Sequence, residues 1–381
     1  MMQFLTDFPG MIKIRKAVFW KLNPLPLPRP FKDATGGIRK ASLFGDWVQL
    51  YDEDGTMGEG PCTELMKDYF IPILLKSEPL TLNQLREKLF WSIRNFGYQS
   101  FHVRELGSLD MVLCDLLSVR AGIPLHRMLG ATQDWSNVYK GGGSVLLSDE
   151  ELVEDILRFK SEGYRQTKIK VGGTEDWQDD IRRIGKIREA VGDDFGIAVD
   201  ANQKWDVRTA FDFIEEASAL NVSWMEEPIH AYDMNGLKQL RTMLDDAGIG
   251  VPIAMGESVR SYYEFEQYAD HGVDHIQPAN AALFCLDEYL KADRLSKALG
   301  LKISSGGITF INVALGALYG PEGLIEYHQP IMEVLVPYMS VTSRVQDGRF
   351  YLPDQPGIPM RMDFEHLEKD GLLAGKTVLT D

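Results

Sequence analysis

Four stretches of the chain decide the fold: TKIKV (167–171), FGIAVDAN (195–202), VSWMEEP (222–228) and VPIAMGE (251–257). Each is a short apolar, largely β-branched run that contains or ends in charged or amide side chains. Amphipathic helical patterns separate them, for example DWQDDIRRIGKIREAVG. Short strands that alternate with helices predict a parallel sheet with helical crossovers.

The same alternation continues on both sides of these stretches. Further strand candidates are VYKGGGSVL (138–146), VDHIQPA (273–279), LKISSG (301–306) and LIEYH (324–328). Eight such repeats predict a closed parallel α/β barrel. The alternative is a doubly wound open sheet, which usually carries a GxGxxG phosphate loop after its first strand. Because GGGS (141–144) lacks that spacing, we favour the barrel.

The segments outside the repeats have a different texture. Residues 11–20 and 47–52 read as strands, and Asp54-Gly55 supplies a hairpin turn. The proline-rich stretch 22–37 reads as an extended loop. Helical periodicity runs from about 62 to 130, with Thr81 and Ser108 in positions typical of N-caps. The tail after 331 reads as irregular and strand-like, returning toward the N-terminal segment.

Composition excludes several classes of protein. The 381 residues contain 40 Lys and Arg against 56 Asp and Glu, a net charge of −16, which disfavours binding to nucleic acid or to a membrane surface. No apolar run is long enough for a transmembrane helix, and the N-terminus does not resemble a signal peptide. Three scattered cysteines, Cys62, Cys114 and Cys285, read as buried reduced thiols. We therefore expect a cytoplasmic protein.

Charged residues gather at the predicted C-terminal ends of the strands, where barrel enzymes carry their chemistry. Lys168 and Lys170 lie two residues apart and therefore on one face of their strand. The next three strands each end in an acidic residue. Carboxylates from three consecutive strands suit a hard divalent cation such as Mg²⁺, which prefers oxygen ligands.

The motifs KIK (168–170), VDAN (199–202), MEEP (225–228) and GES (256–258) resemble those of the enolase superfamily, in its mandelate racemase/muconate lactonizing enzyme branch. The resemblance implies a modified TIM barrel, (β/α)₇β, with an N-terminal α+β capping domain. It also implies homo-oligomers, and removal of a proton α to a carboxylate to give a metal-stabilised enediolate. The implied domains are 11–130 (cap), 137–330 (barrel) and 331–381 (a C-terminal return packing on the cap).

The same resemblance assigns individual residues. It implies that Asp200, Glu226 and Glu257 bind Mg²⁺ and that Asn202 supports the site. Glu326 matches a family position that hydrogen-bonds the substrate carboxylate.

A neutral lysine is the predicted base. A free lysine titrates near 10.4, but a second ammonium group and a divalent cation both disfavour its charged form. We therefore expect Lys170 to be the general base and Lys168 to lower its pKa and bind the substrate carboxylate.

The chain departs from the family where a second acid/base group is expected. Ala279 and Gly306 stand where mandelate-racemase-like members carry Asp and His, and Asn280 stands near where other branches carry Lys. Racemisation needs groups on both faces of the substrate, whereas elimination of water can proceed from one face. An acid-sugar dehydratase (a lyase) is therefore the leading prediction. The alternatives are a racemase, epimerase or cycloisomerase of the same superfamily, and a catalytically silent relative.

Other polar residues near the predicted mouth complete the candidate site. His328 is a candidate replacement acid, and Tyr139 and Lys140 are candidates to contact substrate oxygens. The proline-rich loop carries basic residues, which would suit a polyhydroxy acid or a diacid as substrate. His271 and His275 flank a strand start on the far side of the barrel, and we expect no function for them.

Overall fold

A closed parallel barrel of eight strands forms the centre of the computed structural model, which describes residues 3–35, 38–39, 42–43, 45–279, 283–306, 309–340 and 344–381. Its strands are β8 (Trp135–Gly141), β9 (Gln166–Lys170), β10 (Gly196–Asp200), β11 (Val222–Glu226), β12 (Ile253–Met255), β13 (His275–Ile276), β14 (Lys302–Ser305) and β15 (Leu324–His328). Each pairs in parallel with the next, and β15 pairs with β8 to close the circle. The open-sheet alternative is therefore excluded, and the predicted barrel is confirmed.

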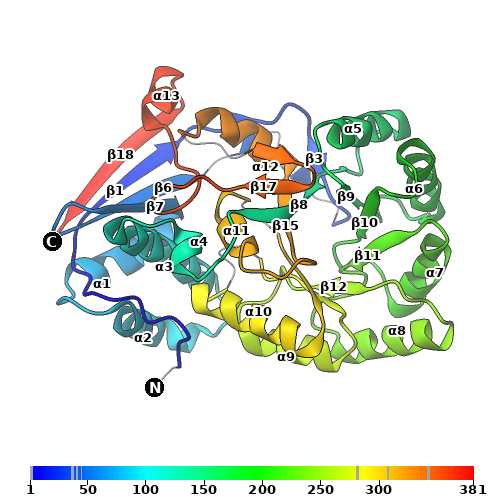
Figure 1. Ribbon diagram of the computed structural model, residues 1–381, viewed down its shortest axis with the longest axis horizontal. Coiled ribbons are helices and arrows are strands. Elements are labelled where there is room, and N and C mark those ends of the chain that lie inside the picture. Colours follow the sequence, from blue (N-terminus) through cyan, green and yellow to red (C-terminus); the bar gives the residue numbers. More distant parts are fainter. Residues whose placement is uncertain are drawn as a thin grey trace.

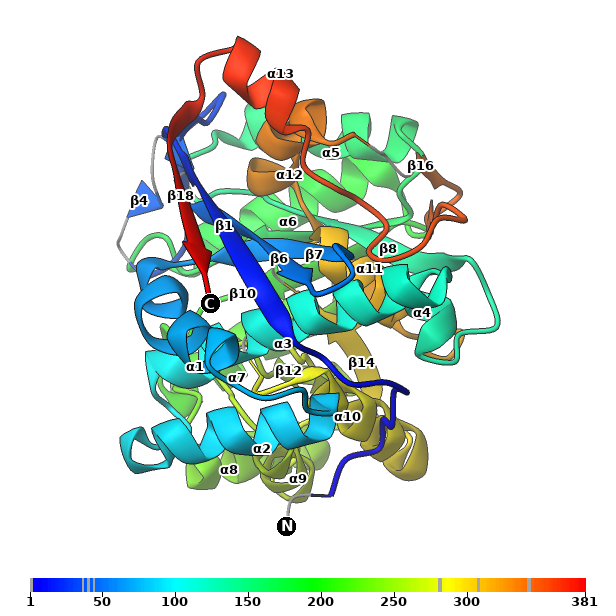
Figure 2. The same ribbon diagram turned by 90° about the vertical axis from the view of Figure 1, so that its left-hand side faces the viewer.

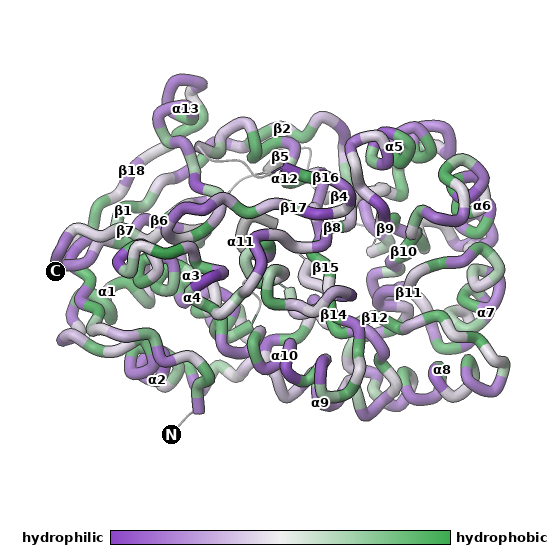
Figure 3. Tube along the Cα trace, viewed as in Figure 1, coloured by the Kyte–Doolittle hydropathy of each residue, from purple (hydrophilic) through white to green (hydrophobic). Residues whose placement is uncertain are grey.

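Helices connect these strands on the outside of the barrel (Figure 1). They are α5 (Asp149–Ser161), α6 (Gln178–Val191), α7 (Val207–Ser218), α8 (Met234–Asp246), α9 (Tyr262–Asp270), α10 (Leu286–Leu299) and α11 (Thr309–Gly316), and α12 (Gln329–Leu335) follows the last strand. A capping box fixes the start of α5, because the Ser148 side chain accepts from Glu151 N and the Glu151 side chain accepts from Ser148 N. Apolar and polar residues alternate along α6 and α8, as expected for amphipathic helices (Figure 3).

A second, antiparallel sheet lies beside the barrel, with strand order β18-β1-β6-β7 (Figure 2). Its strands are β1 (Ile14–Leu22), β6 (Asp46–Asp52), β7 (Met57–Cys62) and β18 (Leu373–Thr380). The helices of this part are α1 (Ile71–Leu75), α2 (Leu82–Ile93), α3 (Phe101–Ala121) and α4 (Leu125–Met128). We call this part the cap.

One of the two predicted N-caps is confirmed. Thr81 caps α2 in a capping box with Gln84. Ser108 is instead buried inside α3, which begins at Phe101 after Ser100. The helix therefore starts about two turns earlier than predicted, and its first turns continue the buried pattern with Val103 and Glu105.

The chain after the barrel contacts both parts of the molecule. The hairpin of β16 (Arg344–Gln346) and β17 (Arg349–Tyr351) adds to the barrel sheet beside β8. After α13 (Phe364–Lys369), β18 pairs antiparallel with β1 of the cap. The proline-rich stretch 22–37 forms two short ribbons with the residues that follow it, in which β2 (Leu25–Pro26) pairs with β5 (Ser42–Leu43), and β3 (Phe31–Lys32) with β4 (Ile38–Arg39).

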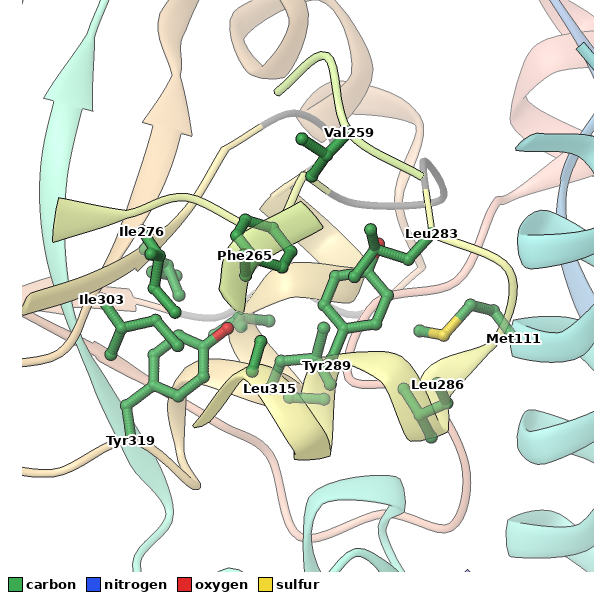
Figure 4. Packing of buried hydrophobic residues seen from close by; sticks show 14 of the residues in the cluster. Met111, Val259, Phe265, Ile276, Leu283, Leu286, Tyr289, Ile303, Leu315 and Tyr319 are labelled. Atoms are coloured by element: carbon green, nitrogen blue, oxygen red, sulfur yellow. The ribbon is translucent and has the colours of Figure 1, made fainter. Parts of the chain in front are cut away.

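One hydrophobic core runs from the cap into the barrel. Figure 4 shows Met111 of α3 beside Leu283 and Leu286, at the junction with α10. A smaller apolar cluster of Tyr139, Ala198, Trp224 and Ala254 fills the inside of the barrel itself. Cys62, Cys114 and Cys285 are free and buried, as predicted. No helix in the described part of the chain is long and apolar enough to cross a membrane.

Candidate active site

Two lysines at the C-terminal end of β9 point into the barrel and contact its acidic residues. Lys168 Nζ lies 2.5 Å from Glu226 Oε1 and 3.4 Å from both Asp200 Oδ2 and Glu326 Oε1. Lys170 Nζ lies 2.5 Å from Asp200 Oδ2. All five side chains are buried. The structure thus brings together five of the residues that the sequence placed at strand ends.

Strand register explains this convergence. Asp200 stands opposite Lys170 on one side and opposite Glu226 on the other. Glu326 reaches the cluster from β15, across β8, because Gly141 leaves room for it. A Cβ atom at Gly141 would lie 1.9 Å from Glu326 Oε1.

The five charges shift one another's pKa values. Burial, the largest single effect, lowers the pKa of Lys170, but Asp200, Glu257 and Glu226 together outweigh it and leave that pKa raised. Burial likewise lowers the pKa of Lys168, but Glu226, Glu326 and the other neighbouring acidic groups together raise it. Burial and the neighbouring Asp200 and Glu326 raise the pKa of Glu226 to about 8, although Lys168 opposes them. Lys168 does lower the pKa of Lys170, as predicted, but the protein's own residues leave that pKa raised, not lowered.

The residues expected to hold Mg²⁺ are only partly assembled. Within the described ranges, no three His, Cys, Asp or Glu side chains are grouped closely enough to hold a metal ion. Asp200 and Glu226 lie together, whereas Glu257 is an exposed residue two positions beyond the end of β12.

The chemistry of the cluster nevertheless fits a hard divalent cation. Three buried carboxyl groups, on Asp200, Glu226 and Glu326, face only two lysines. Asn202 is buried beside them, donating its backbone N–H to Asp200 Oδ1 at 2.9 Å, and its side-chain Oδ1 has no hydrogen-bond partner. An unpaired buried oxygen beside an excess of carboxylate is what an oxygen-liking cation satisfies.

Tyr139 and Lys140 point to opposite sides of β8. Tyr139 lies inside the barrel, packs against Trp224, and has no hydrogen-bond partner for its buried hydroxyl. Lys140 faces the helices instead, where its Nζ lies 2.7 Å from Glu162 Oε2 and over the rings of Phe159 and Tyr164. The structure therefore does not bring Lys140 to the cluster, since adjacent residues of a strand alternate between faces.

His328 lies at the mouth, under the proline-rich loop. It ends β15 and precedes α12, and its ring packs edge-on against Phe31 of β3 with centroids 5.6 Å apart. Burial raises the pKa of Glu326, but Lys168 and then His328 outweigh it and lower that pKa. Arg29 of the same loop pairs with Asp155 of α5 and not with the cluster.

One of the positions that lack acid/base side chains borders the site. A Cβ atom at Gly306 would lie 3.2 Å from Glu326 Oε2, so this position faces the cluster. Its carbonyl oxygen accepts from Asn312 Nδ2 at 2.5 Å, and that of Ala279 accepts from the Tyr289 hydroxyl. Asn280 lies outside the described residues.

Sequence reasoning missed two buried polar residues inside the barrel. His275, for which no function was expected at a strand start on the far side of the barrel, begins β13 but is 1% exposed and lies in the interior beside Trp224. Gln277 donates to Glu226 Oε2 at 2.7 Å. The missed signal is their spacing, because residues two apart on a strand share a face, and Gln277 lies two positions before Ala279, the strand-end position already singled out.

A parallel eight-stranded barrel with ionisable residues converging at the C-terminal strand ends is the architecture of TIM-barrel enzymes. Residues 151–366 match the family described as Enolase C-terminal domain-like. The chain belongs to the enolase superfamily, of the mandelate racemase/muconate lactonizing enzyme type.

Curated relatives have more than one activity. The chain is 31% identical over 287 residues to L-talarate/galactarate dehydratase of Salmonella typhimurium, a match covering 75% of this chain and 70% of that protein. It is 28% identical over 359 residues to 3,6-anhydro-alpha-L-galactonate cycloisomerase of Streptomyces coelicolor, covering 91% and 96%.

Solved structures agree with these matches. The Salmonella typhimurium dehydratase, liganded with Mg and L-lyxarohydroxamate, superimposes with a TM-score of 0.83 at 26% identity, covering 100% of this chain and 97% of that one. L-talarate dehydratase of Polaromonas sp., complexed with Mg and L-glucarate, gives 0.84 at 25% identity, covering 97% and 99%.

Proposed function

We propose that the protein is a Mg²⁺-dependent dehydratase of acid sugars, removing a proton from the carbon next to a carboxylate and then eliminating water. The observation that carries this proposal is the buried pair Lys168 and Lys170, held among carboxylates on one side of the barrel mouth. The opposite side has only Ala279 and Gly306 where a second base would stand.

Asp200, Glu226 and Glu257 would hold the cation, with Asn202 beside them. When bound, Mg²⁺ would supply positive charge that stabilises the developing substrate dianion. Binding by Glu257 requires its exposed side chain to turn toward Asp200 and Glu226.

The chain's own residues then account for the reaction. Lys170, in its neutral form, takes the α-proton, and the electrons of that C–H bond move into the substrate carboxylate to give an enediolate dianion. Those electrons then form the carbon–carbon double bond as the C–O bond of the neighbouring carbon breaks. The departing hydroxide takes a proton from His328 and leaves as water. The resulting enol tautomerises to a 2-keto-3-deoxy acid. Lys168, Glu326 and the Tyr139 hydroxyl contact the substrate carboxylate and hydroxyl groups.

Screening aldonic and aldaric acids for 2-keto-acid formation with added Mg²⁺ tests this function. Lys170→Ala should lower turnover about 10²- to 10⁴-fold, as loss of a general base does. Lys302→Ala is the matched control, since this exposed lysine begins β14 at the opposite end of the barrel. Absence of 2-keto acid from every substrate, or normal turnover by Lys170→Ala, would refute the proposal.

An isomerase is the second candidate, favoured by the cycloisomerase that matches 91% of this chain. Reaction in deuterated water separates the two. A dehydratase forms a 2-keto acid with loss of water, whereas an isomerase incorporates deuterium at the α-carbon and keeps the substrate's composition. Homo-oligomeric assembly and a cytoplasmic location stay predictions.

A further inference from the structure

A chain of buried hydrogen bonds leads from Glu226 down into the barrel. Gln277 Nε2 donates to Glu226 Oε2 at 2.7 Å and to Ser304 Oγ at 3.3 Å. Ser304 Oγ in turn lies 2.9 Å from His275 Nε2. The four side chains are at most 5% exposed.

Neighbouring strands place these residues together. His275 begins β13 and Gln277 follows it two positions later, so both face the interior. Ser304 lies on the adjacent strand β14, where Ile303 stands opposite Ile276. The register of the strands therefore brings these hydrogen-bonded side chains together, without any contribution from a loop.

This series of hydrogen bonds gives the two carboxylate oxygens of Glu226 different donors. Oε2 accepts from Gln277 Nε2 and, at 3.2 Å, from Trp224 Nε1, both neutral donors. Oε1 faces Lys168 Nζ at 2.5 Å, toward the other carboxylates. Both hydrogens of the Gln277 amide are used, one on Glu226 and one on Ser304, so turning the carboxylate would break bonds at both ends of the amide.

Stability alone does not explain this arrangement. His275 Nδ1 is buried without a hydrogen-bond partner, and such a group destabilises the folded protein. An apolar side chain of similar size would fill the space without that cost. Burial also lowers the pKa of His275 to about 3, which keeps the imidazole uncharged and able to bond Ser304 without adding charge beneath the site.

We propose that Gln277, Ser304 and His275 are positioning residues that hold Glu226 with Oε2 turned into the barrel, leaving Oε1 for the divalent cation. This inference rests on the proposed function, in which Glu226 is a ligand of that cation. It predicts that the affinity for Mg²⁺ depends on residues that do not touch the cation.

Two adjacent serines give a matched test. Ser304→Ala removes the hydroxyl in the middle of this series of hydrogen bonds. Ser305→Ala makes the same change at an equally buried residue whose hydroxyl pairs with Tyr319. Isothermal titration of the full-length protein with MgCl₂, without substrate, should show affinity weakened about tenfold or more by Ser304→Ala. The affinity of Ser305→Ala should stay within about twofold of the native protein, and Gln277→Met should weaken binding at least as much as Ser304→Ala.

Melting temperatures without Mg²⁺ separate positioning from packing. If the two serine variants lose similar thermal stability and both keep native Mg²⁺ affinity, the chain is only structural and the inference is wrong. If Ser304→Ala does not fold, the thermal stability and Mg²⁺ affinity of Gln277→Met and Ser305→Ala are compared in the same way to test the inference. A native protein that binds Mg²⁺ but dehydrates no sugar acid would refute the proposed reaction, while the affinity comparison would still decide this inference. A native protein that binds no Mg²⁺ refutes both.

Discussion

At the scale of single residues, Gly141 gives Glu326 its place in the site. A Cβ atom there would lie 1.9 Å from Glu326 Oε1, so Gly141→Ala should push Glu326 away from Lys168. We expect kcat/KM for the sugar-acid substrate to fall about 100-fold, since misplacement of a site residue by about 1 Å has that effect. The control is Gly185→Ala, whose Cβ would meet nothing within 4 Å. Equal activity of the two variants would contradict this explanation.

His275 should leave a signature in the pH dependence of stability. Burial lowers its pKa to about 3, whereas an unfolded histidine titrates near 6.5. Between these values the unfolded state binds the extra proton, so the contribution of His275 to stability is complete above pH 6.5 and is lost as pH falls toward 3. The slope is at most about 1.4 kcal/mol per pH unit.

Urea unfolding at several pH values measures this slope. The native protein should lose stability faster between pH 6.5 and 4.5 than His275→Phe, whatever the offset between the two curves. His271→Phe, at a half-buried position, should run parallel to the native protein. Parallel curves for His275→Phe would contradict the buried, uncharged state of His275.

The sequence predicted which residues stand at strand ends, but not all the faces they occupy. Lys168 and Lys170 share a face by spacing alone, and the structure has them side by side in the cluster. Tyr139 and Lys140 are adjacent, so alternation allowed only one of them inside. The conformation of Glu257 was out of reach, because it depends on the chain beyond β12 and on the lysines that hold the other carboxylates.

At the scale of elements, the eight strands were predictable and their ends were not. Apolar runs identified every barrel strand, yet VDHIQPA (273–279) yields only the two-residue β13. Ladder hydrogen bonds end where the chain turns toward the mouth, and the apolar pattern continues past that point. The error at Ser108 has a similar cause, since α3 is buried on nearly all sides and its apolar period does not mark its start.

Ser144 joins two elements at the mouth, the proline-rich loop and the turn after β8. Its Oγ accepts from Lys32 N at 2.9 Å, and Val145 N donates to Lys32 O at 3.1 Å. Ser144→Ala removes the side-chain bond and loosens the loop over the site. We expect KM for the sugar acid to rise about tenfold with kcat changed less, because the predicted role of the loop is to bind substrate, whereas the cluster carries the proposed reaction.

Steady-state kinetics measure this split. Ser148→Ala is the control, because it removes the N-cap of α5 a few residues away and should lower stability by about 1 kcal/mol without raising KM. A fall in kcat alone for Ser144→Ala would show that the loop acts on the chemical step instead.

At the scale of the whole molecule, buried ion pairs join the segments that surround the barrel. Asp110 of α3 pairs with Arg86 of α2 and accepts from Leu286 N at the start of α10. The N-terminal segment binds in the same region, where Thr6 N donates to Asp287 Oδ1 at 2.8 Å.

Asp115 of α3 binds the C-terminal segment through Arg361 and Ile358 N. The cap therefore contacts the barrel through charged groups as well as through the shared core.

Arg361 tests how much these pairs contribute. Its guanidinium bonds both oxygens of Asp115, at 2.8 and 3.1 Å, and lies 3.4 Å from Glu59. Arg361→Met leaves two buried carboxyl groups without their cation and should lower the free energy of unfolding by about 3 kcal/mol at pH 8. Arg344→Met, at an exposed position of β16, should change it by less than about 0.5 kcal/mol.

The pH dependence of the Arg361 effect distinguishes lost charge pairing from lost packing. Burial already raises the pKa values of Glu59 and Asp115, although Arg361 opposes it, and removing Arg361 raises them further. In the Arg361→Met variant, the folded state therefore binds protons more readily than the unfolded state. The free energy of unfolding of the variant thus falls as pH rises above about 4. Chemical denaturation should show a smaller deficit at pH 5 than at pH 8. A deficit independent of pH would mean that the aliphatic stem of Arg361, and not its charge, stabilises the junction between the C-terminal segment and the cap.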